Sequence, residues 1–150
     1  MLVFRLIVLI SIFLPQQLLA SYEPEKIKNT VTNNPDIFLV SDWKEEGTTW
    51  HAITSQKWMS ISISNKQSQL ISPYLNAKQI AESKTRCLTL AVSGLSIASD
   101  KDKKRVLKLI DTSTQHHRLK SLEMNGARLE VSPKLVGAFV RLFCVVKPNT

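Results

Sequence analysis

The sequence contains few of the residues that most often mark a site of chemistry. Its 150 residues include two cysteines, three histidines and four glycines. The glycines stand far apart, at positions 47, 94, 126 and 137, so the chain has no glycine-rich loop for phosphate. The spacings typical of zinc sites, such as Cys-x-x-Cys and His-Glu-x-x-His, are also missing. The sequence therefore predicts no metal site and no cofactor.

Candidates for catalysis are equally few. The hydrolase spacing Gly-x-Ser-x-Gly does not occur. Glu45 and Glu46 precede a glycine in a predicted turn, where acidic residues are common for solvation alone. His51, His116 and His117 remain as weak candidates for acid–base work, because imidazole titrates near neutral pH. His51 lies in a predicted strand and the other two in a predicted polar loop, so an enzyme would need the fold to bring them together.

The longest N-terminal apolar run, residues 6–14, is too short to cross a bilayer, which takes roughly 20 residues as a helix. It follows a single cation, Arg5, and is ended by Pro15. This order is typical of a secretory signal peptide over residues 1–20, with cleavage near Ala20. No cysteine lies at this junction, so the sequence predicts neither a lipid-modified terminus nor a transmembrane anchor. We expect a periplasmic or secreted protein.

The two cysteines, Cys87 and Cys144, both stand in apolar surroundings. In an oxidising compartment two such thiols usually pair. Closing a loop of this length stabilises a fold by about 4 kcal/mol in the chain-entropy account. The alternative is a pair of free buried thiols. Two cysteines are far fewer than a disulfide-dense secreted domain holds, and no Asn-x-Ser/Thr acceptor occurs, which favours a bacterial periplasm.

Positive charge dominates the chain, with 20 Lys and Arg against 12 Asp and Glu. Loss of the signal peptide would leave 19 against 12, a formal charge of +7, which favours anionic partners. Five cations gather at Lys101, Lys103, Lys104, Arg105 and Lys108. They form either a solvated helix face or a contact for anionic lipid or glycan. No aromatic residues are interleaved with them, which disfavours nucleic acid as a partner.

The hydrophobic pattern predicts a polar N-terminal arm over residues 21–36 and one α+β domain over 37–150. The arm holds at most a short helix, residues 24–30. Strands are predicted at 37–43, 48–54 and 57–64, the last with alternating serine and apolar residues. Asn76 is a good cap for a helix that continues to about Val92. Ser99 with Asp102 resembles a capping box for a short second helix through Ile110.

The strongest local signal is Asn125-Gly126, because both residues tolerate the positive φ of a two-residue hairpin turn. The register pairs Leu122 with Leu129 on one face. After Pro133, residues 135–146 are apolar apart from Arg141, as in a final central strand buried on both faces. The resulting fold class is α+β, with a meander, a hairpin and a final strand in one antiparallel sheet covered by one or two central helices.

All three tryptophans, Trp43, Trp50 and Trp58, fall in the predicted meander. Each is a candidate either for core packing or for an outward-facing interface residue. Our leading hypothesis is an exported, non-enzymatic binding or assembly protein, such as a subunit, chaperone or adaptor of an envelope or secretion machine. Two alternatives are a small cationic hydrolase of an anionic polymer using the histidines, and a binder of anionic lipid or glycan.

Overall fold

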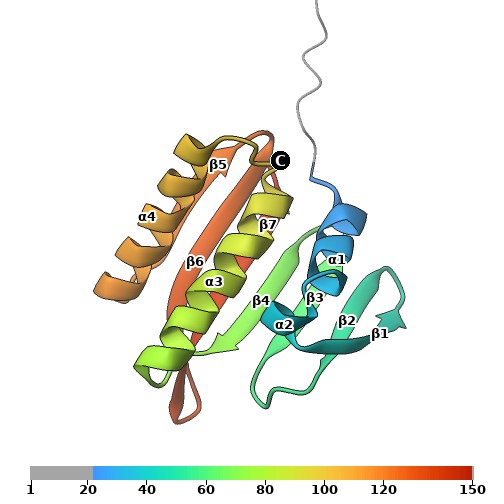
Figure 1. The fold of residues 1–150 in the computed structure, drawn as a ribbon, viewed down its shortest axis with the longest axis horizontal. Coiled ribbons are helices and arrows are strands. Elements are labelled where there is room, and N and C mark those ends of the chain that lie inside the picture. Colours follow the sequence, from blue (N-terminus) through green and yellow to red (C-terminus); the bar gives the residue numbers. More distant parts are fainter. Residues whose placement is uncertain (1–21, 150) are drawn as a thin grey trace, which may run out of the picture.

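A computed structural model describes residues 22–149 of the chain. Within this range the chain forms an α+β fold of four helices and one antiparallel sheet of seven strands (Figure 1). The predicted signal peptide, residues 1–20, lies outside the described residues. The elements are α1 (Pro24–Thr32), α2 (Pro35–Phe38), β1 (Val40–Glu46), β2 (Thr49–Thr54), β3 (Ser60–Ser64), β4 (Ser68–Pro73), α3 (Ala77–Gly94), α4 (Asp100–His116), β5 (Lys120–Met124), β6 (Ala127–Val136) and β7 (Phe139–Pro148).

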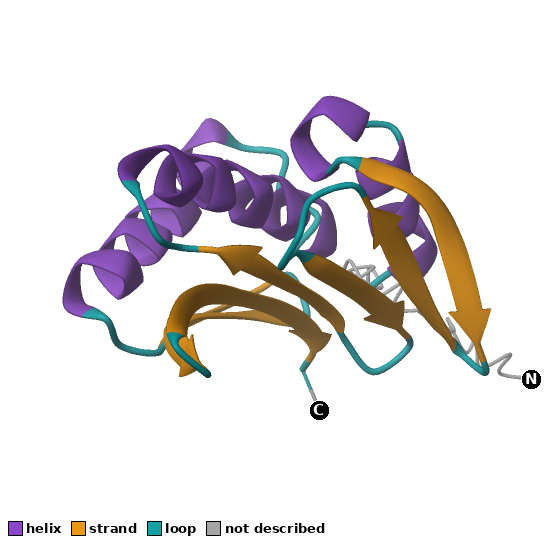
Figure 2. Cartoon of the chain, turned by 90° about the horizontal axis from the view of Figure 1, so that it is seen from below, coloured by secondary structure: helices purple, strands orange, loops and turns teal. Residues whose placement is uncertain are grey.

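The sheet has the order β1-β2-β3-β4-β7-β6-β5 and consists of two meanders. The first runs through β1 to β4 and the second through β5 to β7. The connection through α3 and α4 carries the chain from β4 to the far edge, and the second meander then returns until β7 pairs with β4. The helices all lie on one side of the sheet, as Figure 2 shows, so the described residues leave the other side open.

The predicted hairpin is confirmed. Asn125 and Gly126 have φ angles of 51° and 77°, and Leu122 pairs with Leu129 as expected. The side chain of Asn125 also donates to the carbonyl of Leu95 at 2.9 Å, which ties the turn to the end of α3. Turn chemistry and strand pattern agree here, which is why a short sequence was sufficient to predict the register.

Both central helices begin where their caps predict. The Asn76 side chain accepts from the backbone N–H of Gln79, and Ser99 accepts from that of Asp102. α3 continues two residues past the predicted end, and α4 is longer than the predicted short helix because it continues to His116. The prediction stopped early because residues 111–116 are polar, and only some of them, such as Ser113, are buried.

The N-terminal segment differs from the predicted polar arm. Residues 21–36 contain α1, whose Ile27 and Val31 are fully buried in the common core. Tyr22 fixes the start of this segment, because its hydroxyl bonds the Ser64 carbonyl at 2.8 Å and the Ser68 hydroxyl at 2.7 Å. Burial raises the pKa of Tyr22 to about 12. Two apolar residues four positions apart are enough to pack one side of a short helix.

Two strand predictions need correction, and one strand was missed. The strand predicted at 37–43 is wrong at its start, because Pro35 opens the short helix α2 and β1 follows from Val40. The third predicted strand, 57–64, begins at Ser60. β4 was not predicted at all. Its inward side chains include Ser68 and Ser72, which are fully buried and hydrogen-bonded, so the buried face does not look apolar in the sequence.

The apolar run 135–146 is two strand segments and not one. Gly137, at φ 63°, turns the chain between β6 and β7. In β7 only one face is covered by helices, and there Leu142, Cys144 and Val146 are buried. Phe143, on the alternate face, is only half-buried. The prediction of a strand buried on both faces is therefore wrong, because no second helical layer covers the sheet within residues 22–149.

The helices are attached to the sheet by a covalent bond and by a buried polar network. The predicted disulfide is confirmed: Cys87 of α3 is bonded to Cys144 of β7, with Cα atoms 5.6 Å apart. Next to it the buried guanidinium of Arg86 donates to the Ile37 carbonyl at 2.7 Å and to the Ser72 hydroxyl at 3.2 Å. Burial lowers the pKa of Arg86. α2, α3 and β4 are thereby held together.

Reduction of the disulfide should lower the free energy of unfolding by about 4 kcal/mol, because the bond closes a long loop between residues 57 positions apart. Urea unfolding followed with and without reductant measures this loss. The double variant Cys87→Ala, Cys144→Ala is the control and should be insensitive to reductant. Equal stability of the oxidised and reduced wild type would contradict the prediction.

Gly94→Ala should destabilise the fold by about 1 to 3 kcal/mol, although alanine is the better helix former. A Cβ at this position would lie 2.7 Å from Cγ1 of Val146, so α3 and β7 would have to separate. Urea unfolding of Gly94→Ala, Val146→Ala and the double variant tests the cause. The double variant should cost less than the two single changes together, and simple additivity would refute the close contact.

Candidate functional site: an apolar patch around Trp58

The three tryptophans have different surroundings. Trp43 and Trp50 pack below α1, where the Lys28 ammonium lies 5.9 Å and 4.5 Å from their ring centroids. The Trp43 indole also donates to the Thr32 hydroxyl at 3.0 Å. Trp58 lies between β2 and β3 and is 57% exposed. Of the three predicted interface candidates, only Trp58 is mostly in solvent.

The backbone of Trp58 is in the left-handed region, with φ 69°. A bulky residue there is a conformational outlier, at a cost of about 1 to 3 kcal/mol. The neighbouring Met59 points into the core and is buried, so the unusual backbone separates an inward side chain from an outward one. Strain of this kind persists where surrounding structure or function requires it, which marks Trp58 as a candidate functional residue.

Trp58 lies beside an exposed apolar turn of the sheet. Its ring lies 6.0 Å from that of Phe139, and Phe139 pairs across the β6–β7 turn with Val136. The adjoining Leu135 is the most exposed large apolar residue of the described chain, at 72%. Turns between strands are normally polar, so an exposed apolar turn is unusual. We call Trp58, Leu75, Leu135, Val136 and Phe139 the Trp58 patch.

A small hollow opens within the Trp58 patch. It has a volume of about 30 Å³ and is lined by Trp58, Pro73, Leu75, Phe139, Val140 and Arg141. The Arg141 guanidinium forms one wall and lies 5.1 Å from the Trp58 ring centroid. On the neighbouring strand the Lys134 ammonium lies 5.0 Å from the ring centroid of Phe143. The hollow is therefore lined mainly by apolar side chains, with the cation of Arg141 in one wall.

The structure does not bring the histidines together. His51 lies on the open side of the sheet, in a row of paired residues with Ser62 and Gln69. His117 caps α4 and contacts Tyr74 edge-on, with ring centroids 6.2 Å apart. Tyr74 lies five residues beyond Gln69, so the two sites are roughly 16 Å apart along the strand direction alone. His116, the last residue of α4, directly precedes His117 in the chain. One substrate bond cannot contact both groups.

The basic stretch of α4 is partly neutralised. Lys103 pairs with Asp100 at 3.3 Å and Arg105 with Asp102 at 3.2 Å. A hydrogen bond from the Ser99 hydroxyl lowers the pKa of Asp102, which keeps that carboxylate charged. The cations exposed on α4 that form no ion pair with other described residues are Lys101, Lys104 and Lys108. These three are a sparse row on a solvated helix.

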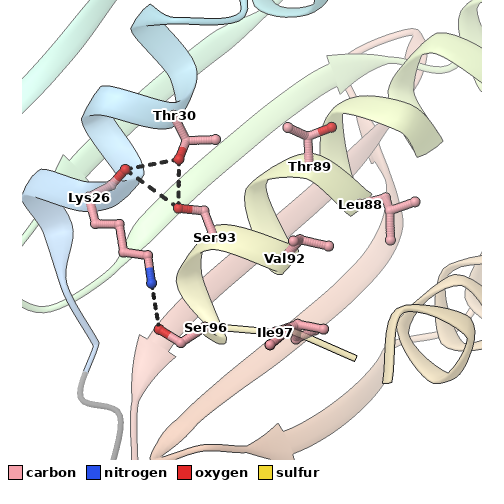
Figure 3. A pocket seen from close by; sticks show the side chains of 9 residues that line it. Lys26, Thr30, Leu88, Thr89, Val92, Ser93, Ser96 and Ile97 are labelled. Carbon is pink, nitrogen blue, oxygen red and sulfur yellow. Dashed lines mark hydrogen bonds between the residues drawn. The ribbon is translucent and has the colours of Figure 1, made fainter. Parts of the chain in front are cut away.

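A larger hollow lies between α1 and α3 and has a volume of about 470 Å³ (Figure 3). Its polar groups bond one another: Lys26 donates to the Ser96 hydroxyl at 3.0 Å, and the hydroxyls of Thr30 and Ser93 are 2.8 Å apart. No histidine or carboxylate lines it. The hollow therefore has no base to activate its hydroxyls. Within residues 22–149 no group of His, Cys, Asp and Glu could hold a metal ion.

Sequence reasoning missed most of the Trp58 patch. Leu135, Val136 and Phe139 were assigned to a buried strand, because an apolar run usually is one. The available signal was Gly137, a turn residue in the middle of that run.

Comparison with family models, with curated proteins and with solved structures found no match for this chain. No helix of the described residues is both long and apolar enough to span a bilayer.

Trp58→Asn should leave the free energy of unfolding within about 1 kcal/mol of the wild type, because asparagine tolerates the left-handed backbone and the lost ring is mostly exposed. Trp50→Asn should lose on the order of 2 kcal/mol or more, because that ring is half-buried beneath α1. Urea unfolding compares the two. An equal loss in both variants would show that Trp58 is a packing residue.

Proposed function

We propose that this protein is an exported, non-enzymatic binding or assembly protein, such as a subunit, chaperone or adaptor of an envelope or secretion machine. The observation that carries the proposal is the Trp58 patch. An exposed tryptophan on a strained backbone, next to an exposed apolar turn, has no role in packing the core. Tryptophan is enriched among the residues that dominate binding energy at protein interfaces.

Two features support a location outside the cytoplasm. A Cys87–Cys144 disulfide suits a periplasmic or extracellular protein, because thiols in the bacterial cytosol are kept reduced. The predicted signal peptide agrees with this location. The hydrolase alternative loses its support, since His51 is remote from the other two histidines. Binding to anionic lipid or glycan through α4 remains a weaker alternative, supported by Lys101, Lys104 and Lys108.

The test is capture of partners by the full chain, exported in its source organism with a tag at the C-terminus. That end lies at the opposite end of β7 from the Trp58 patch, as Figure 1 shows, so a tag leaves the patch free. Wild type and Trp58→Asn are compared by quantitative mass spectrometry of the envelope fraction. At least one protein should be retained by the wild type and reduced about tenfold or more in the variant.

Leu107→Ser is the matched control, because Leu107 is another exposed apolar residue but lies on α4. It should retain the same partner as the wild type. Identical protein sets on wild type and Trp58→Asn would refute a binding role for the Trp58 patch. Hydrolytic activity of the purified protein that depends on His51 would refute the non-enzymatic assignment.

A further inference from the structure

The surroundings of the Trp58 patch have one sign of charge. The sequence holds no aspartate or glutamate from residue 47 to residue 81, nor from residue 131 onward. These stretches supply β2, β3, β4 and β7 and the end of β6 that carries the patch. The cations nearest the patch along the chain are Lys57, Lys78, Lys134 and Arg141, whereas Lys66 and Lys147 lie at the far ends of β3 and β7. Lys147 there pairs with Glu130 at 2.9 Å. All twelve acidic residues of the chain lie outside these two stretches.

Two of these cations oppose each other directly. Lys134 of β6 pairs with Arg141 of β7 across the antiparallel ladder. Like charges at such positions destabilise a sheet. Neither side chain forms an ion pair with a carboxylate in residues 22–149. An incoming carboxylate would relieve the repulsion and accept from Arg141 at the same time.

The hollow complements this charge with an apolar feature. The rings of Trp58 and Phe139 are inclined at 40° to each other, and Leu75 lines the same hollow. Arg141 contributes to both features, since its guanidinium covers the Trp58 ring while it belongs to the cationic pair. A ligand that carries an apolar group next to a carboxylate could place the first on the aromatic rings and the second on the cations.

We infer that the Trp58 patch binds an acidic segment of another protein, with one apolar side chain packed against the rings of Trp58 and Phe139 over the hollow and flanking carboxylates on Arg141 and Lys134. This inference rests on the proposed function and specifies the chemistry of the partner. A second copy of this chain is a poor occupant, because a symmetric contact would place Arg141 and Lys134 against their own copies. A lipid surface carries anionic charge but has no side chain to fill the hollow.

The test is selection of binders from a displayed library of random 12-residue peptides on the immobilised full chain, with Trp58→Asn used to remove unrelated binders. Enriched peptides should carry an aromatic or aliphatic residue beside two or more acidic ones. A synthetic peptide of the consensus sequence is then titrated against each variant. Arg141→Glu should weaken its binding at least about tenfold, and binding to wild type should weaken as salt concentration rises.

Arg141→Glu is an informative change because glutamate opposite Lys134 makes a favourable cross-strand pair, so loss of binding cannot be ascribed to unfolding. Lys101→Glu on α4 changes the net charge equally and should leave the affinity for the peptide unchanged. Thermal unfolding of both variants verifies that they fold.

Three results would overturn the inference: enrichment of neutral or basic peptides, no enrichment, or equal loss of binding in Lys101→Glu and Arg141→Glu. Vesicles of phosphatidylglycerol and phosphatidylethanolamine provide the remaining comparison. Binding to them that Trp58→Asn and Arg141→Glu both abolish would identify an anionic membrane as the occupant instead. If capture from the envelope is Trp58-dependent but the selected peptides are not acidic, the proposed function stands and the acidic partner does not.

Discussion

The contact between α3 and β7 is the one on which the rest of the structure depends. β7 is the strand at which two otherwise separate meanders meet, since it pairs with β4 on one side and β6 on the other. The Cys87–Cys144 bond and the close approach of Gly94 to Val146 both act at this strand. A helix held that closely covers one face of the junction, so the buried residues of both meanders form one core.

The same arrangement explains why the sheet has two different faces. All described helices lie on one side, and the residues of β7 that point toward them are buried. On the other side, Phe143 and Lys134 remain at the surface together with Arg141. Exposed apolar side chains, among them Trp58 and Phe139, gather only near one end of this face. The placement of the helices on one side is what leaves this end of the sheet exposed.

Sequence reasoning predicted the structure correctly where several local signals agreed. It failed where a polar residue is buried or an apolar residue is exposed. The hairpin at Asn125 and the cap at Asn76 were predictable, because turn and cap chemistry is local. β4 was hidden because Ser72 is buried through hydrogen bonds to other buried polar groups, which depend on tertiary structure. The Trp58 patch was hidden for the opposite reason. Leu135 is of a residue type that is usually buried. It is exposed here because it lies next to the turn at Gly137.

The interior position of β7 has a consequence for how the molecule is assembled. β7 follows every other described element in the chain, yet it lies inside the sheet, between β4 and β6. The first meander can pair its own strands as soon as they are available, but β4 lacks its second neighbour until β7 has been made. Cys144 is on that same strand, so the disulfide with Cys87 cannot form before β7 has been synthesised. The sheet can therefore be completed only after all seven strands have been synthesised, and not strand by strand during synthesis.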